Sequence, residues 1–141
     1  MYMLDTNILI FSIRHPTSAC AAMLADHVVS NDVCISVVTY AELEYGIENS
    51  SDPEKNRAAI NKILAGIRIL DFDINAGKHF GSILAELRRK GKTQDSRDRD
   101  KMIAAHSRSK GYVLVTDNTK DFEDIDNLVL ENWRVEGDLA H

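Results

Sequence analysis

Short apolar segments alternate with helical patterns along this 141-residue chain, and this alternation constrains the fold most strongly. Strands are expected at residues 2–4, 33–36, 67–72, 112–116 and 128–130. Helices are expected at 8–13, 16–27, 38–49, 53–66, 74–90 and 101–109. Strands joined through helices form right-handed crossovers, so the sheet should be mostly parallel and covered on both faces. The sequence therefore predicts an α/β fold, a three-layer α/β/α sandwich.

The length and composition fit a single domain over residues 1–134, followed by a disordered tail at 135–141. Hydrophobic residues make up 44% and charged residues 28%, as in ordinary globular proteins. The apolar runs are too short to cross a bilayer, and no leader-like segment precedes the first strand, so we expect a cytoplasmic protein with no membrane partner. Cys20 and Cys34 lie in apolar surroundings and are expected to be reduced, buried thiols.

The net charge of −5 argues against a protein that coats nucleic acid non-specifically, but the cations are unevenly distributed. Nine of the 17 lysine and arginine residues fall between positions 88 and 110. Two interpretations stay open for this basic stretch. It either forms a track for phosphates or complements helix C-termini and solvates a helix surface.

Several acids follow strands or begin helices. Asp5 leaves the C-terminal end of the first strand, where Thr6 or Asn7 is placed to cap the next helix. Asp117 follows the fourth strand, so a parallel sheet brings it to the same edge as Asp5. Glu42 lies one turn into the helix after the second strand. These acids could equally be helix caps, and Thr39 with Glu42 has the spacing of a capping box.

Carboxylates about 4 Å apart repel by about 4 kcal/mol per pair at an effective dielectric of 20, so a cluster requires neutralisation. Mg²⁺ prefers oxygen ligands and suits a site without Cys or His. Bound ions of this kind activate water and stabilise displacement at phosphorus. Asp100 is a further candidate, but its helix follows a helix, so the strand rule does not place it.

Four motifs together resemble the PIN-domain family, and most closely its VapC toxins of type II toxin–antitoxin pairs. They are Met3-Leu4-Asp5-Thr6-Asn7, Thr39-Tyr40-Ala41-Glu42-Leu43-Glu44-Tyr45-Gly46, Asp100-Lys101-Met102-Ile103-Ala104-Ala105-His106, and Leu114-Val115-Thr116-Asp117-Asn118 through Phe122. The resemblance implies an α/β/α sandwich and an endoribonuclease dependent on Mg²⁺ or Mn²⁺. Asp5 and Asp100 would be its principal metal ligands, and Glu42 would bind metal directly or through water.

Two departures from the family pattern leave alternatives open. The fourth acidic position of the family falls on Asn118, with Asp117 beside it, so either side chain could face the metal. The segment from Gly91 to Asp100 is longer than usual and lacks a proline, so Asp98 or Asp95 competes with Asp100. His106 has the look of a general base but is more typical of a hydrogen-bonded packing residue.

The resemblance also implies partners. These are an RNA substrate (initiator tRNA, another tRNA or a ribosomal RNA loop), a VapB-like antitoxin that inserts a segment into the acidic crevice, and a second copy in a homodimer. The antitoxin would carry the assembly to operator DNA. Two alternatives remain: a catalytically impaired PIN-like module that binds operator DNA with its antitoxin, and an RNA-processing enzyme without a toxin role.

Overall fold

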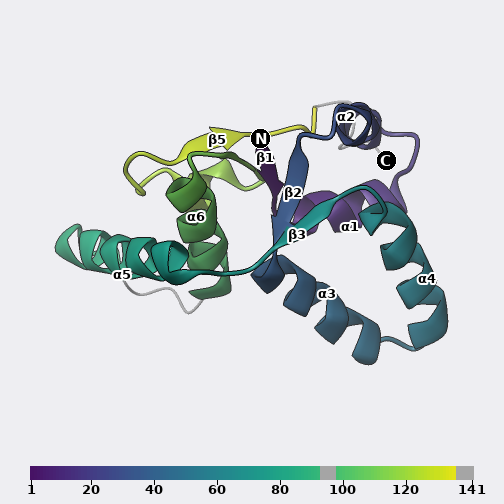
Figure 1. Cartoon of the computed structure of the whole chain (residues 1–141), viewed down its shortest axis with the longest axis horizontal. Helices are drawn as coiled ribbons and strands as arrows, with labels where there is room; N and C mark the ends of the chain where they lie inside the picture. The colour runs from purple at the N-terminus through teal and green to yellow at the C-terminus, as the bar shows by residue number, and fades with distance from the viewer. Residues whose placement is uncertain (93–97, 136–141) are drawn as a thin grey trace.

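The sheet is parallel throughout, as expected. The computed structural model describes residues 1–92 and 98–135. In this part of the chain, five strands pair in the order β3-β2-β1-β4-β5 (Figure 1). Every neighbouring pair runs in parallel. The strands are β1 (Tyr2–Leu4), β2 (Val33–Ser36), β3 (Arg68–Leu70), β4 (Val113–Val115) and β5 (Val129–Glu131).

Helices cover both faces of the sheet and confirm the expected α/β/α layers. They are α1 (Thr6–Arg14), α2 (Ala19–Val29), α3 (Val37–Glu48), α4 (Pro53–Leu64), α5 (Ile74–Arg89) and α6 (Asp98–Lys110), with a short 3₁₀ helix, η1 (Thr119–Phe122). Figure 1 shows α5 and α6 on one side of the sheet and α1, α2 and α4 on the other.

The strand residues alternate between two cores, because successive side chains of a strand point to opposite faces. Leu4 and Val115 pack with the core under α1 and α2, whereas Met3 and Leu114 pack with the core under α5 and α6. Cys20 and Cys34 belong to opposite cores, and both are buried free thiols, as expected. Their separation by the sheet explains why they form no disulfide.

The expected cap of α1 was wrong by one residue. Asp5, and not Thr6 or Asn7, is the N-cap, because its Oδ1 accepts a hydrogen bond from the Thr6 N–H at 2.8 Å. The start of α2 also differs from the expectation at Pro16. The helix begins at Ala19, where the Ser18 hydroxyl accepts from the Ala21 N–H and caps the first turn.

The expected capping box of α3 is also wrong. Ser36 ends β2 and caps α3 directly, accepting from the Val38 N–H at 3.1 Å. The helix therefore starts earlier than Thr39, and Glu42 lies beyond the first turn, out of reach of the cap. The side chain of Glu42 therefore takes no part in the cap of α3. Asp52 caps α4, accepting from the Lys55 N–H at 3.2 Å.

The segment before α6 is partly described. Of the segment from Gly91 to Asp100, residues 93–97 lie outside the described residues, and α6 begins at Asp98, three residues before the expected start at 101. The expected tail lies outside them from residue 136 onward. Within the described ranges, no single helix is long and apolar enough to cross a membrane. Only α1 and α2 taken together, with a bend of 112° between them, reach that length and composition.

Candidate active site

Asp5 is held rigidly at the carboxyl end of β1. Its backbone N–H donates to the Val115 carbonyl of β4, and its side chain is only 5% exposed. The Thr6 N–H donates to Oδ1, and the Thr116 hydroxyl donates to Oδ2 at 2.9 Å. Both carboxylate oxygens therefore have a fixed direction, set by the helix start on one side and the neighbouring strand on the other.

Glu42 reaches the same place from α3. Its Oε1 accepts from the Thr6 hydroxyl at 2.9 Å, so Thr6 bonds Asp5 through its backbone and Glu42 through its side chain. The other oxygen, Oε2, lies 3.9 Å from the Nε of Arg99 in the first turn of α6. The beginnings of α1 and α6 and the second turn of α3 thus meet at the carboxyl edge of the sheet.

The pKa of Asp5 reports how close its acidic neighbours are. Burial raises this pKa most, and the charges of Asp100 and Glu42 raise it further. The hydrogen bonds from Thr116 and Thr6 lower it, and the net result is a pKa raised from 3.8 to about 6. Asp5 and Glu42 thus share Thr6 as a hydrogen-bond donor, and Asp100, which the strand rule could not place, lies near enough for its charge to act on Asp5.

Asp117 points to a different neighbour. Its Oδ2 lies 2.7 Å from the Nη1 of Arg134, and its side chain is 18% exposed. The next residue, Asn118, donates its backbone N–H to the Thr116 hydroxyl and its side-chain amide to Asp121. Asp121, which was not among the predicted residues, is thus the side-chain partner of Asn118.

Asp98 and Asp95 were the two alternatives to Asp100. Asp98 is 66% exposed, with its Oδ1 4.0 Å from the Nζ of Lys101, and Asp95 lies outside the described residues.

His106 is fully buried, and its Nδ1 is 2.8 Å from the Ser36 hydroxyl. Burial is the main cause that lowers the pKa of His106. This environment fits the expected packing role.

Most cations of the basic stretch are engaged by acids on nearby elements. Lys90 pairs with Asp126, Arg108 with Glu86, and Lys110 with Asp73. These contacts favour a helix surface over a phosphate track. Arg99 differs from them because its partner is the site acid Glu42.

The chemistry of the site fits a hard divalent cation. Its donors are carboxylate oxygens. Burial and the neighbouring acids destabilise the ionised form of Asp5, and a bound cation would stabilise it. Among the described residues, no three His, Cys, Asp or Glu side chains approach closely enough to form a preassembled metal cage. Mg²⁺ usually takes one or two carboxylates and keeps several waters, so the arrangement is compatible with it.

Comparison with known proteins shows the family of this chain. The PIN domain family model matches residues 2–128. The chain belongs to the PIN-domain family. A tRNA(fMet)-specific endonuclease VapC from Shigella flexneri is 42% identical to this PIN domain over 132 residues, which are 94% of this chain and 97% of the relative. A ribonuclease VapC2 from Haemophilus influenzae is 41% identical with the same coverage.

Solved structures of VapBC complexes share the fold of this PIN domain. The VapBC2 structure from Rickettsia felis, bound to a DNA fragment of the promoter, matches with a TM-score of 0.86 and 34% identity, covering 94% of this chain and 98% of that one. The DNA-bound VapBC structure from Salmonella typhimurium matches with a TM-score of 0.85 and 39% identity, covering 94% and 97%. The predicted resemblance to VapC toxins is confirmed.

Proposed function

We propose that this PIN domain is a metal-dependent endoribonuclease and the toxin of a VapBC-type toxin–antitoxin pair. The observation that carries the proposal is the buried carboxylate of Asp5, fixed through both oxygens and set beside Asp100 and Glu42 at the edge of the sheet. The nearly full-length VapC relatives, two of which are named above as ribonucleases or endonucleases, support it.

In this proposal, Asp5 and Asp100 hold a Mg²⁺ ion, with Mn²⁺ as a substitute, and Glu42 binds it directly or through water. The bound ion supplies an activated water and positive charge for hydrolysis of an RNA phosphodiester. Thr116 and Thr6 keep the Asp5 oxygens aimed, and Asn118 occupies the fourth position of the family motif. Asp117 is the weaker candidate there, because Arg134 already binds its carboxylate.

The test is cleavage of total RNA by the purified protein, with and without Mg²⁺ or Mn²⁺. Asp5→Ala and Asp100→Ala should each reduce cleavage at least about 100-fold, because each removes a charged oxygen donor from the site. Asp126→Ala is the matched control, since it removes an exposed carboxylate that is paired with Lys90. Full activity in both site variants, or full activity after chelation of the metal, would contradict the proposal.

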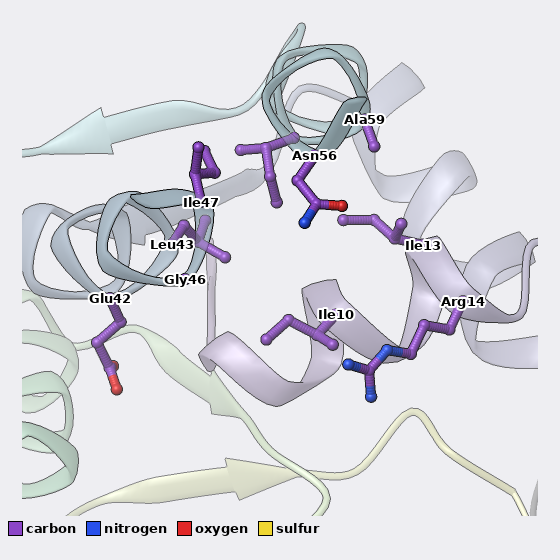
Figure 2. Close-up of a pocket in the computed structure, with 10 residues that line it drawn as sticks. Ile10, Ile13, Arg14, Glu42, Leu43, Gly46, Ile47, Asn56 and Ala59 are labelled. Atoms are coloured by element: carbon purple, nitrogen blue, oxygen red, sulfur yellow. The ribbon is translucent and has the colours of Figure 1, made fainter. Parts of the chain in front are cut away.

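The proposed protein partner is a small VapB-like antitoxin, which would link the toxin to operator DNA. A groove of about 240 Å³ lies between α1, α3 and α4, and Figure 2 shows its apolar walls with Glu42 and Arg14 at the margins. An apolar segment ending in a cation could fill it and reach the acidic site. The VapBC structures of Rickettsia felis and Salmonella typhimurium contain such a pair with DNA and support this partner.

We further propose a cytoplasmic homodimer that acts on tRNA or ribosomal RNA. The name of the Shigella flexneri relative, a tRNA(fMet)-specific endonuclease, favours tRNA. Induction of the protein alone should arrest growth, co-expression of the neighbouring antitoxin should relieve the arrest, and sequencing of the new RNA 5′ ends should identify the target. Growth without arrest, together with RNA cleavage by the purified protein, would favour RNA processing without a toxin role.

The second candidate function is an operator-binding module that has lost nuclease activity. It is favoured by the segment from Gly91 to Arg99, which is longer than the family pattern and lacks its proline or second glycine. Titration of the purified protein with Mn²⁺ by calorimetry separates the two candidates. A saturable site that disappears in Asp5→Ala supports the nuclease, and undetectable binding supports the impaired module.

A further inference from the structure

The segment after β5 makes the contacts from which a further inference follows. Trp133 is 2% exposed and stacks on His27 of α2 with ring centroids 4.6 Å apart. Its indole Nε1 donates to Glu131 at 2.8 Å, and the backbone N–H of Arg134 donates to the Asn132 side chain. The backbone is therefore anchored on the N-terminal side of Arg134, and Figure 1 shows it passing from β5 toward α2.

The side chain of Arg134 joins two elements of the site. Its Nη1 lies 2.7 Å from Oδ2 of Asp117, and its guanidinium carbon lies 3.9 Å from the centre of the Phe11 ring on α1. Arg134 is 21% exposed and Asp117 18% exposed, so water screens the pair less than it screens a surface salt bridge. The cation–π contact and the charged hydrogen bond restrict the guanidinium in two directions.

Asp117 begins the turn that leads from β4 into η1. The following N–H, that of Asn118, donates to the Thr116 hydroxyl at 3.1 Å, and this hydroxyl donates its own hydrogen to Oδ2 of Asp5 at 2.9 Å. The Asn118 N–H thus helps to hold the Thr116 hydroxyl in the orientation that faces Asp5. Asp117 is the residue through which the C-terminal segment can hold that turn.

We infer that Arg134 is a positioning residue for the active site: by binding Asp117 it fixes the turn at Asp117 and Asn118, and through Thr116 it fixes the orientation of the Asp5 carboxylate. The inference rests on the proposed nuclease function. It assigns Asp117 to the support of the site, whereas the sequence left Asp117 and Asn118 as equal candidates for the metal. Arg134 itself does not contact the reacting groups.

The inference is tested with Arg134→Ala, Asp117→Asn, the double variant and Arg134→Lys, using cleavage of one RNA substrate at saturating Mn²⁺. Each single variant should lower kcat about 10-fold to 100-fold and change KM less than about twofold, because misplacement of a ligand affects the reaction more than RNA binding. The double variant should be no slower than the slower single variant, because the two residues act as a unit. Arg134→Lys should recover part of kcat.

Arg57→Ala is the control, because Arg57 forms a bidentate but more exposed pair with Glu44 between α4 and α3. It should leave kcat unchanged. All reactions are run well below the lowest melting temperature, and if Arg134→Ala does not fold, Arg134→Lys and Asp117→Asn decide.

Wild-type kcat in the Arg134 and Asp117 variants overturns the inference, as do losses that simply add in the double variant. An inactive wild-type protein instead overturns the proposed function on which the inference rests.

Discussion

Replacement of Asp5 by Asn should stabilise the metal-free protein while it abolishes activity. Asn has the same shape, its Oδ1 can accept from the Thr6 N–H, and its amide can donate to the Thr116 hydroxyl. The substitution removes a charge that is costly in this position, because burial, Asp100 and Glu42 all raise the pKa of Asp5. A residue required for function would then be unfavourable for the fold.

The magnitude follows from the pKa. A rise from 3.8 in the unfolded chain to about 6 in the folded protein corresponds to about 3 kcal/mol, since one pKa unit is about 1.4 kcal/mol. The folded state binds the Asp5 proton more tightly, so the contribution of Asp5 to stability is fully present below pH 3.8. It is lost as the pH rises through about 6. The advantage of Asp5→Asn should be small at pH 4 and about 3 kcal/mol at pH 8.

The assay is urea unfolding in EDTA between pH 4 and pH 8, comparing the wild-type protein with Asp5→Asn at each pH. Asp73→Asn is the matched control. The Ala76 N–H and then Lys110 lower the pKa of Asp73, so this exposed residue has the opposite sign. Its stabilising effect is present above its ordinary pKa, and Asp73→Asn should gain nothing as the pH rises. A stability difference for Asp5→Asn that is constant with pH would refute the reasoning.

Three other predictions concern residues around the site. Arg99→Ala removes the cation 3.9 Å from Glu42 and should raise KM for RNA about fivefold, with a smaller change in kcat. Steady-state cleavage at two salt concentrations measures both constants. An unchanged KM would show that Arg99 does not bind the RNA. His106→Ala should lower the free energy of unfolding by about 2–4 kcal/mol, because the ring is fully buried and hydrogen-bonded. Urea unfolding measures this loss. A loss below about 1 kcal/mol would contradict a packing role. Thr116→Val removes the hydrogen bond that lowers the pKa of Asp5. Mn²⁺ binding, measured by calorimetry, should therefore weaken near pH 6 and recover near pH 8. Equal weakening at both pH values would mean that the lost hydrogen bond acts by misplacing Asp5 and not by raising its pKa.

The order of the elements could be predicted from the sequence because each strand is a short apolar run with polar boundaries. Asp5 could be placed at the functional edge because it directly follows such a run, and a parallel sheet gathers the carboxyl ends of its strands. Asp100 could not be placed by this rule. Its position depends on the packing of α6 against α5 and α3, which periodicity does not encode, and the family resemblance supplied it.

The helix caps were misassigned locally, by one to three residues, but the partners of the site acids were missed because they lie far apart in the chain. The Thr39 and Glu42 spacing fits a capping box, but the hydroxyl that Glu42 accepts from belongs to Thr6, 36 residues away. The family spacing falls on Asn118 and left open whether Asp117 beside it faces the metal, and the residue that distinguishes the two, Arg134, lies 17 positions beyond Asp117. Local patterns identify where an acid lies, and tertiary partners decide what it binds.

The hydrogen bonds around Asp5 show how the site can stay both rigid and reactive. Two neutral donors, the Thr6 N–H and the Thr116 hydroxyl, fix the carboxylate and lower its pKa, but burial and the two neighbouring acids outweigh them. A cationic partner in their place would stabilise the ionised form and would also cancel the charge that attracts a metal ion. Arg134 binds Asp117 instead, so it supports the geometry from one residue beyond Thr116 without pairing with Asp5. The residues that fix the position of the Asp5 carboxylate are thus different from those that set its charge. The Arg134 variants test the positioning, and Thr116→Val tests the effect on the pKa of Asp5.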